Sequence, residues 1–234
     1  MEIAAITLDL DDTLWPIEPV IARAEERLDA WLQSYCPRAA RAYPILAMRA
    51  LRERVAVEHP HLAHDFTEQR RLTLERALIP HGYTMAHVED AYAEYFTARN
   101  EVECYADALP ALERLAARYP LVSLSNGNAD LRRIGIDRFF RFSISARDCG
   151  VGKPDPAIFR AACEGLNLPA GAVLHVGDDA QLDVAGANAA GLKSAWLNRN
   201  DALWIGAAPP HIHVKNLHEL AERLLQPAAS PALA

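Results

Sequence analysis

Three aspartates stand close together near the N-terminus, in the segment LDLDDTLW at residues 8–15. They follow the apolar run IAAIT, which is typical of a buried strand. In an extended chain Asp9 and Asp11 would point to the same side, roughly 7 Å apart. At an effective dielectric constant of about 20, two such carboxylates repel each other by roughly 2 kcal/mol. We expect such a pair where a cation neutralises it, where one carboxylate is protonated, or where the site does chemistry.

Polar side chains also stand where two later strands are expected to end. The apolar segment LVSLSN closes on Ser125 and Asn126, and AVLHVGDD closes on Asp178 and Asp179. Continuously apolar strands that alternate with helices predict a parallel sheet covered on both faces. Ligands of such sheets bind at the carboxyl ends of the strands. The sequence therefore predicts one crevice lined by carboxylates and a hydroxyl.

The elements that must position these residues fall into two groups. Residues 16–102 carry apolar residues at steps of three and four, which predicts an all-helical block. Strands and helices alternate after it. We predict an α/β core made of residues 1–15 and 103–234, with an inserted helical domain of residues 16–102. The expected helices span 17–35, 39–58, 65–79, 84–99, 107–118, 155–166, 181–190 and 216–225, and the expected strands span 3–9, 121–126, 141–146, 172–179 and 194–198.

Composition narrows the class of protein. The chain has 234 residues, is 51% hydrophobic and 24% charged, and carries a net charge of -7, which is typical of a globular protein and unlike a nucleic-acid-binding one. No apolar segment is long enough to span a membrane. The four cysteines form no CxxC pair, and the N-terminal apolar run has no basic segment before it. A cytoplasmic protein with reduced thiols is therefore expected.

Four segments together resemble the haloacid dehalogenase superfamily, in its phosphatase branch. They are DLDDT at 9–13, LSNG at 124–127, GKPDPAIF at 152–159 and GDDAQLD at 177–183. The resemblance covers nearly the whole chain. It implies a Rossmann-like parallel sheet with a helical cap inserted between the first and second motifs. The implied activity is Mg²⁺-dependent hydrolysis of a small-molecule phosphate monoester.

The resemblance also implies a role for each motif aspartate. Asp9 would be the nucleophile that takes the phosphoryl group as an aspartyl-phosphate. Asp11 would give a proton to the leaving oxygen and later take one from water. Mg²⁺ would be held by the Asp9 carboxylate, the Asp11 backbone carbonyl and the Asp178 carboxylate. Asp183 would hold a metal-bound water or the loop itself.

The remaining motif residues would hold the phosphoryl group. Ser125 would bond one of its oxygens, and Lys153 would pair with both Asp9 and the phosphate. The segments around Leu10, Asn126 and Gly127 would supply backbone amides. Asp12 is interpreted as a structural turn residue.

The inserted helices would select the substrate. Four of their arginines are candidates for contacting an anionic leaving group, namely Arg23, Arg27, Arg49 and Arg52. The stretch VLHVGDDAQLDVAGANAAGLKSAWLN is similar to capped phosphatases that act on flavin mononucleotide and on the phosphorylated ribityl-pyrimidine of riboflavin synthesis. A sugar phosphate or phosphoglycolate remains an alternative substrate.

Three other functions stay open. The first is a 2-haloacid dehalogenase, against which Asp11 argues, because a halide leaving group needs no acid. The second is a non-enzymatic phospho-receiver switch. The third is an interaction module that kept the fold and lost the activity.

Several residues outside the motifs are given structural interpretations. The segment RRLTLERAL at 70–78 is expected to be a charged helix face, and His175 a packed, hydrogen-bonded core residue. Trp15 could contact the substrate or pack beneath the helices. A solvated loop is expected to contain His211 and His213.

Overall fold

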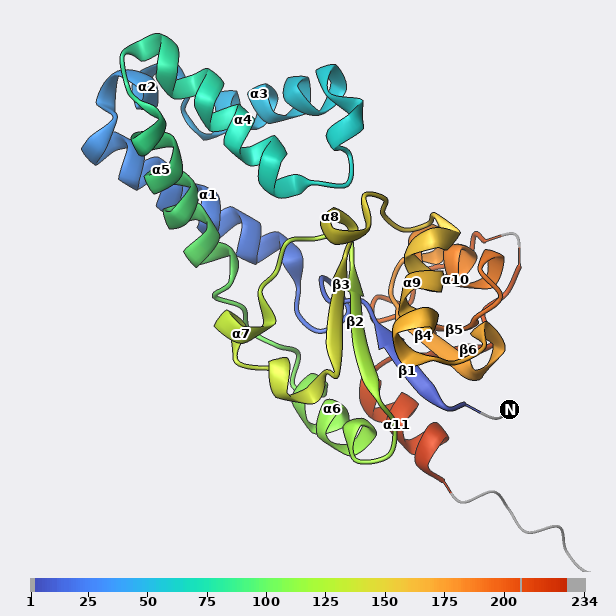
Figure 1. Ribbon diagram of the computed structural model, residues 1–234. Helices are drawn as coiled ribbons and strands as arrows, with labels where there is room; N and C mark the ends of the chain where they lie inside the picture. The colour runs from blue at the N-terminus through green and yellow to red at the C-terminus, as the bar shows by residue number, and fades with distance from the viewer. Residues whose placement is uncertain (1–2, 207, 227–234) are drawn as a thin grey trace, which may run out of the picture.

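One parallel sheet forms the centre of the molecule (Figure 1). The computed structural model describes residues 3–206 and 208–226. The strand order is β3-β2-β1-β4-β5-β6, and every neighbouring pair is parallel. The strands are β1 (Ala5–Leu8), β2 (Leu121–Ser125), β3 (Phe142–Ser145), β4 (Val173–Gly177), β5 (Lys193–Leu197) and β6 (Ile212–Val214). This confirms the predicted α/β class and the five expected strands.

The sixth strand was missed, because β6 is a three-residue edge strand and too short to show a period of its own. It carries His213, which was expected in a solvated loop. His211 lies just before the strand, where its Nδ1 lies 3.2 Å from the Ser194 hydroxyl oxygen.

Alternate residues of the central strands face two different helical layers. Ile6 and Leu8 of β1 are fully buried in a cluster with α6 (Ala108–Ala116) and α11 (Leu217–Leu225). Ala5 of the same strand faces a second cluster, which includes α9 (Pro156–Leu166) and α10 (Gly186–Ala189). Since successive side chains of a strand point to opposite faces, the apolar run of β1 is buried on both sides. Helices therefore cover both faces of the sheet.

Five helices form a separate bundle between β1 and α6, as Figure 1 shows. Their bounds are α1 (Ile17–Tyr35), α2 (Pro37–Ala42), α3 (Ile45–Glu58), α4 (Phe66–Leu78) and α5 (Met85–Arg99), with short 3-10 turns at Pro60–Leu62 and Ile79–His81. The bundle has its own hydrophobic cluster, which includes Leu32, Leu74 and Val88. The helix expected over 39–58 is divided into α2 and α3, because Pro44 disfavours helical geometry at the residue before it.

The shorter elements lie around the sheet. They are α7 (Leu131–Ile134), α8 (Ala146–Cys149), 3-10 turns at Asp137–Phe139 and Ala170–Ala172, and a π-helical turn, η5 (Ala180–Ala185). The described ranges contain no helix that is long and apolar enough to cross a membrane. The four cysteines are free thiols, as expected.

Candidate active site

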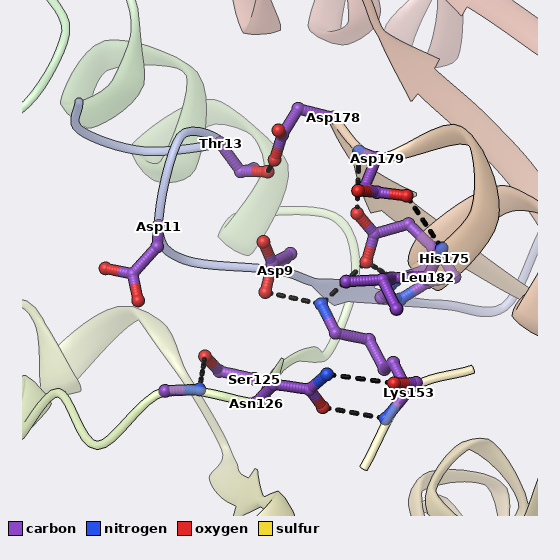
Figure 2. Close-up of polar contacts among 12 residues, drawn as sticks. Asp9, Asp11, Thr13, Ser125, Asn126, Lys153, His175, Asp178, Asp179 and Leu182 are labelled. Carbon is purple, nitrogen blue, oxygen red and sulfur yellow. Dashed lines mark hydrogen bonds and ion pairs between the residues drawn. The ribbon is translucent and has the colours of Figure 1, made fainter. Parts of the chain in front are cut away.

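An ion-paired lysine joins two of the predicted acidic residues. Asp9 follows β1, and its backbone N–H donates to the carbonyl of Val176 in the neighbouring strand β4 at 2.9 Å. Lys153 Nζ lies 2.5 Å from Asp9 Oδ1 and 2.6 Å from Asp183 Oδ1 (Figure 2). All three side chains are buried. The structure thus brings together residues of the first, third and fourth motifs.

Asp183 is held in place by the strands as well as by Lys153. Burial lowers the pKa of His175 and so favours its neutral imidazole. Its Nε2 donates to Asp183 Oδ1 at 3.0 Å, and its Nδ1 accepts from the Thr7 hydroxyl at 2.8 Å. The Asp179 backbone N–H donates to the other oxygen of Asp183 at 2.9 Å. The interpretation of His175 as a hydrogen-bonded core residue is confirmed, and Thr7 is a partner that the sequence did not indicate.

The acidic groups of this site are electrostatically coupled. Burial raises the pKa of Asp9 well above its usual range, although Lys153 opposes that rise. Burial and the charge of Asp183 together raise the pKa of Asp178 to about 7. Burial would also raise the pKa of Asp183, but Lys153 and His175 outweigh the effect of burial and lower this pKa. Burial alone would lower the pKa of Lys153, yet its two carboxylate partners raise it. The site therefore holds more negative charge than one lysine balances.

Three of these carboxylates could hold a divalent cation. Asp9, Asp178 and Asp183 each offer an oxygen atom, and the three atoms lie within 4.8 Å of one another. Hard oxygen donors of this kind suit Mg²⁺. A cation there would also balance the buried charge that raises the pKa of Asp9 and Asp178. Asp178 is oriented by Thr13, whose hydroxyl donates to Asp178 Oδ1 at 2.9 Å. The donor set fits the metal that the resemblance implies.

Asp11 lines the same cavity but lies outside the cluster of three carboxylates. The strand ends at Leu8, the chain then turns, and Asp12 takes a φ of 57° while its Oδ1 accepts the Ile17 N–H at 3.0 Å. The structural interpretation of Asp12 agrees with this turn. Figure 2 shows the Asp9 carboxylate near Lys153 and that of Asp11 pointing elsewhere. The extended geometry expected through the motif ends at Leu8, yet the side chains of Asp9 and Asp11 both line the same cavity.

Two residues hold the Asp11 carboxylate instead. Arg99 Nη2 lies 2.8 Å from Oδ1 and 2.7 Å from Oδ2, and Trp15 Nε1 donates to Oδ1 at 2.9 Å. Trp15 is fully buried, so it packs beneath the helices rather than lining the cavity. Gly127 makes room for this arrangement, since a Cβ there would lie 2.5 Å from Asp11 Oδ2.

The second motif supports Lys153 through a side-chain amide. Asn126 Nδ2 donates to the Lys153 carbonyl at 2.9 Å, and the Lys153 N–H donates to Asn126 Oδ1 at 2.7 Å (Figure 2). The sequence indicated only the backbone around Asn126. The hydroxyl of Ser125 accepts the Gly127 N–H at 2.9 Å. Asn126 thereby fixes the loop from which Lys153 reaches the carboxylates.

The predicted residues line a cavity of about 560 Å³ between the sheet and the bundle. Its wall on the sheet side includes Asp9, Asp11, Ser125, Asn126, Gly127, Lys153, Asp178 and Asp183. Leu10 is buried and lines a neighbouring cavity of about 780 Å³, which shares Ser125, Asn126 and Gly127 with the first. All the site residues predicted from the four motifs thus line one of two adjoining cavities.

The arginines of the bundle that line the cavity are mostly not the four candidates expected from the sequence. Of the four candidates only Arg52 lines the cavity with the carboxylates. Arg23 bonds the Glu101 carbonyl, Arg27 pairs with Glu94 and Glu101, and Arg49 pairs with Glu25. Their guanidinium groups are therefore engaged within the bundle.

Two buried arginines, Arg70 and Arg99, line the cavity and were not among the candidates. The segment 70–78 was interpreted as a charged helix face, yet the charged side chain of Arg70 is buried. Its spacing to Leu74 and Ala77 places it on the apolar stripe of α4, and a charge on such a stripe was the available signal. Arg99 is the last residue of α5, where the chain returns toward the core.

Comparison with known proteins agrees with the fold and the site. A parallel sheet covered by helices, with acidic residues at the ends of β1 and β4, is a Rossmann-like fold with a candidate active site. The family model of haloacid dehalogenase-like hydrolases matches residues 3–191, and the chain belongs to this family. The resemblance noted in the four motifs is thereby confirmed.

Individual relatives span most of the chain. This chain is 32% identical over 226 residues to the 5-amino-6-(5-phospho-D-ribitylamino)uracil phosphatase YigB of Escherichia coli K12. The match covers 93% of this chain and 94% of that protein. The chain is 30% identical over 163 residues to a phosphoserine phosphatase of Thermus thermophilus, covering 66% of each. A solved structure described as a 2-haloacid dehalogenase from Pseudomonas syringae is 35% identical, has a TM-score of 0.89, and matches 95% of this chain and 98% of its own.

Proposed function

We propose that this protein is a Mg²⁺-dependent phosphatase that hydrolyses a small-molecule phosphate monoester through an aspartyl-phosphate on Asp9. The observation that carries the proposal is the convergence of Asp9, Asp178 and Asp183 around one position, with Lys153 beside them. The bound cation would supply positive charge that lets the carboxylate and the phosphate approach each other.

The residues of the site have complementary roles in this proposal. Asp9 attacks phosphorus, and the bond from phosphorus to the leaving oxygen breaks. Asp11 gives its proton to that oxygen and then takes one from the water that hydrolyses the aspartyl-phosphate. Lys153 and the Ser125 hydroxyl hold phosphoryl oxygens, with backbone amides around Leu10, Asn126 and Gly127. Lys153 also keeps the Asp9 oxygen oriented through the contact of 2.5 Å.

Dehalogenation is the second candidate, since the Pseudomonas syringae structure is described as a 2-haloacid dehalogenase. A halide leaves as a stable anion and needs neither a proton donor nor a cation to neutralise a phosphate dianion. The cluster of three carboxylates and the acid Asp11 would have no task in that reaction. These groups favour the phosphatase, whereas a phospho-receiver switch would not need a large cavity beside the nucleophile.

For the substrate we propose a ribityl-type phosphate, either flavin mononucleotide or 5-amino-6-(5-phosphoribitylamino)uracil. Support comes from YigB, the Escherichia coli relative that matches over nearly the whole chain. A cavity of about 560 Å³ is large enough for a leaving group of this size, since ligand pockets commonly measure about 300–1,000 Å³. A sugar phosphate or phosphoglycolate is the alternative.

We further propose that residues 16–102 act as a cap domain on a core made of residues 1–15 and 103–234. The separate hydrophobic cluster of the bundle supports this division. Closure of the cap would exclude water from the aspartyl-phosphate site. The four free thiols suit a reducing compartment, and we place the protein in the cytoplasm.

The test is release of inorganic phosphate from para-nitrophenyl phosphate, flavin mononucleotide and a panel of sugar phosphates. We expect turnover with added Mg²⁺ and its loss with a chelator, restored when Mg²⁺ is returned. A parallel assay measures halide release from 2-chloropropionate. Halide release without phosphate release would replace the phosphatase with the dehalogenase. A stable phosphoprotein with no turnover would indicate the receiver switch.

A further inference from the structure

The face that the bundle turns toward the carboxylates carries two buried arginines with unused hydrogen-bond donors. We propose that Arg70 and Arg99 bind the leaving group of the substrate through carbonyl-type oxygens, and so select esters whose leaving group carries such oxygens. This inference rests on the proposed phosphatase function and identifies the class of alcohol that the enzyme accepts.

Arg70 is held rigidly and yet lacks a close partner. Its side chain is 3% exposed, and its guanidinium carbon lies 4.0 Å from the centre of the Tyr95 ring. Glu25 is the nearest carboxylate, with Oε1 4.0 Å from Arg70 Nη2, but its other oxygen accepts from Arg49 Nε at 2.6 Å. Within the part of the chain that the structure describes, Arg70 Nη1 has no hydrogen-bond partner. Tyr95 and Glu25 thus orient Arg70 without satisfying it.

Arg99 shows the same feature on the neighbouring helix. Its Nη2 is engaged by both oxygens of Asp11, while Nη1 is buried and makes no hydrogen bond to any residue of 3–206 or 208–226. Arg99 and Arg70 both line the cavity that contains Asp9. Buried donors without acceptors are costly to a folded protein. Two of them on one cavity wall indicate that an acceptor belonging to a ligand completes the site.

The two walls of the cavity differ in charge. The sheet side carries Asp9, Asp11, Asp178 and Asp183 around Lys153. The bundle side carries three arginines, Arg52, Arg70 and Arg99, and one carboxylate, Glu53, so its net charge is positive. A phosphoryl group with its cation suits the first wall. The second wall suits an electron-rich group at the other end of the substrate. The two ends of one ester can therefore be recognised by opposite walls.

The shape and chemistry of the bundle side indicate which group this is. A guanidinium offers a planar fork of N–H donors that matches carboxylate or carbonyl oxygens better than scattered hydroxyls. Apolar side chains, including Ile17, Ile21 and Phe66, line the same cavity and can cover a carbon skeleton. A ring carbonyl of a heterocycle and a carboxylate are the two sources of such oxygens. A polyol phosphate has neither.

The experiment compares substrates across three arginine variants. Flavin mononucleotide supplies ring carbonyls, phosphoglycolate supplies a carboxylate, and phenyl phosphate supplies neither and serves as the reference ester. The variants are Arg70→Gln and Arg70→Lys, with Arg76→Gln as the matched control on the same helix. Arg76 pairs with Glu58 and is absent from the cavity wall.

For Arg70→Gln, we expect kcat/KM of the better oxygen-bearing ester, divided by that of phenyl phosphate, to fall by about tenfold or more, mainly through KM. In Arg76→Gln this ratio should stay within about twofold of wild type. Arg70→Lys keeps a charge and loses the fork. If the ligand group is a carboxylate, Arg70→Lys should regain most of the selectivity for phosphoglycolate that Arg70→Gln loses. If the ligand group is a ring carbonyl, Arg70→Lys should regain little of the selectivity for flavin mononucleotide.

An unchanged ratio in both Arg70 variants, with melting temperatures near wild type, would overturn the inference while phosphatase activity stands. A wild-type preference for phenyl phosphate over both oxygen-bearing esters would overturn it as well. Failure of the wild-type enzyme to release phosphate from any ester would instead refute the proposed function. If Arg70→Gln does not fold, Arg70→Met takes its place, because methionine fills the buried site and has no N–H donor; an unchanged ratio in Arg70→Met would overturn the inference.

Discussion

Arg99, at the end of α5, and Asp11, in the turn after β1, form an ion pair in which one guanidinium nitrogen contacts both carboxylate oxygens, at 2.8 and 2.7 Å. The two residues come from different parts of the molecule, the helical bundle and the end of the central strand. Arg99 is 2% exposed and the Asp11 side chain 21%, so the contact is screened less than an ion pair on the surface. The direction of the Asp11 carboxylate therefore depends on where the bundle lies.

Replacing Arg99 with lysine tests that dependence. A lysine keeps the charge but cannot hold both oxygens from a planar group. We expect kcat for an alkyl phosphate to fall by about tenfold or more, with a smaller change for para-nitrophenyl phosphate. Steady-state kinetics on both esters gives the result. Arg27→Lys, in an exposed pair of the same bundle, should behave as wild type. An equal loss in both variants would contradict a role for Arg99 in orienting Asp11.

Asp9→Asn should abolish turnover and leave the fold intact. An amide cannot act as the nucleophile, yet it has almost the shape of the carboxylate it replaces. Residual activity is expected below about 1% of wild type, measured as phosphate release, with circular dichroism as the check on folding. Asp12→Asn is the control, because asparagine tolerates the φ of 57° and can accept the Ile17 N–H. Activity of several per cent in Asp9→Asn would remove Asp9 as the nucleophile.

Asp11→Asn should discriminate between leaving groups. An asparagine cannot donate the proton that a poor leaving oxygen needs, whereas para-nitrophenolate departs without one. We expect kcat for alkyl phosphates to fall by about 10²–10⁴-fold. With para-nitrophenyl phosphate, the rate constant of aspartyl-phosphate formation should fall much less. Pre-steady-state bursts separate that step from hydrolysis. Equal burst-rate losses for the two ester types would count against an acid role.

Gly177→Ala should disrupt the carboxylate network at the end of β4. A Cβ at this position would lie 2.2 Å from Asp183 Cγ and 2.3 Å from its Oδ2. Asp183 would have to leave Lys153 and His175, so we expect loss of activity and a destabilisation of about 1–3 kcal/mol. Urea unfolding measures the second quantity. Gly171→Ala is the matched control, since nothing lies within 4 Å of a Cβ there. Wild-type stability and activity in Gly177→Ala would show that Asp183 can move without consequence.

Asp107 should contribute stability that depends on pH. Burial would raise its pKa, but hydrogen bonds from Arg199 and from the Leu217 N–H, at 2.9 and 2.7 Å, outweigh burial and lower it. A carboxyl group whose pKa is lower in the folded state stabilises the protein above its unfolded pKa of about 3.9. That stabilisation is lost as the pH falls through the folded value.

The variant Asp107→Asn removes this titration. We expect it to be less stable than wild type at pH 7, with a difference that shrinks as the pH falls below about 4. Urea unfolding at a series of pH values measures the difference. A gap that stays constant between neutral and acid pH would mean that the Asp107 charge is not the cause.

Much of the site followed from local patterns. The apolar strands, the helices between them and the four motifs were readable because each depends on a few neighbouring residues. Parallel strands bring their carboxyl ends to one edge of the sheet. Asp9, Ser125 and Asp178 could therefore be assigned to one crevice without coordinates. The three-residue strand β6 and the four-residue helices α7 and α8 were too short to produce such a pattern.

Contacts between distant elements were decided by the tertiary structure. Hydrogen bonds link Thr7 to His175 and His175 to Asp183, and others link Asn126 to the backbone of Lys153. No helical or strand period in the sequence relates these residues to one another. The same holds for Arg70 and Arg99, whose importance depends on which face of the bundle meets the cavity. Local periodicity indicates whether a side chain faces a core, but it does not indicate which residue that side chain contacts. That choice is made by the packing of whole helices against the sheet, which sums many weak contacts across the chain.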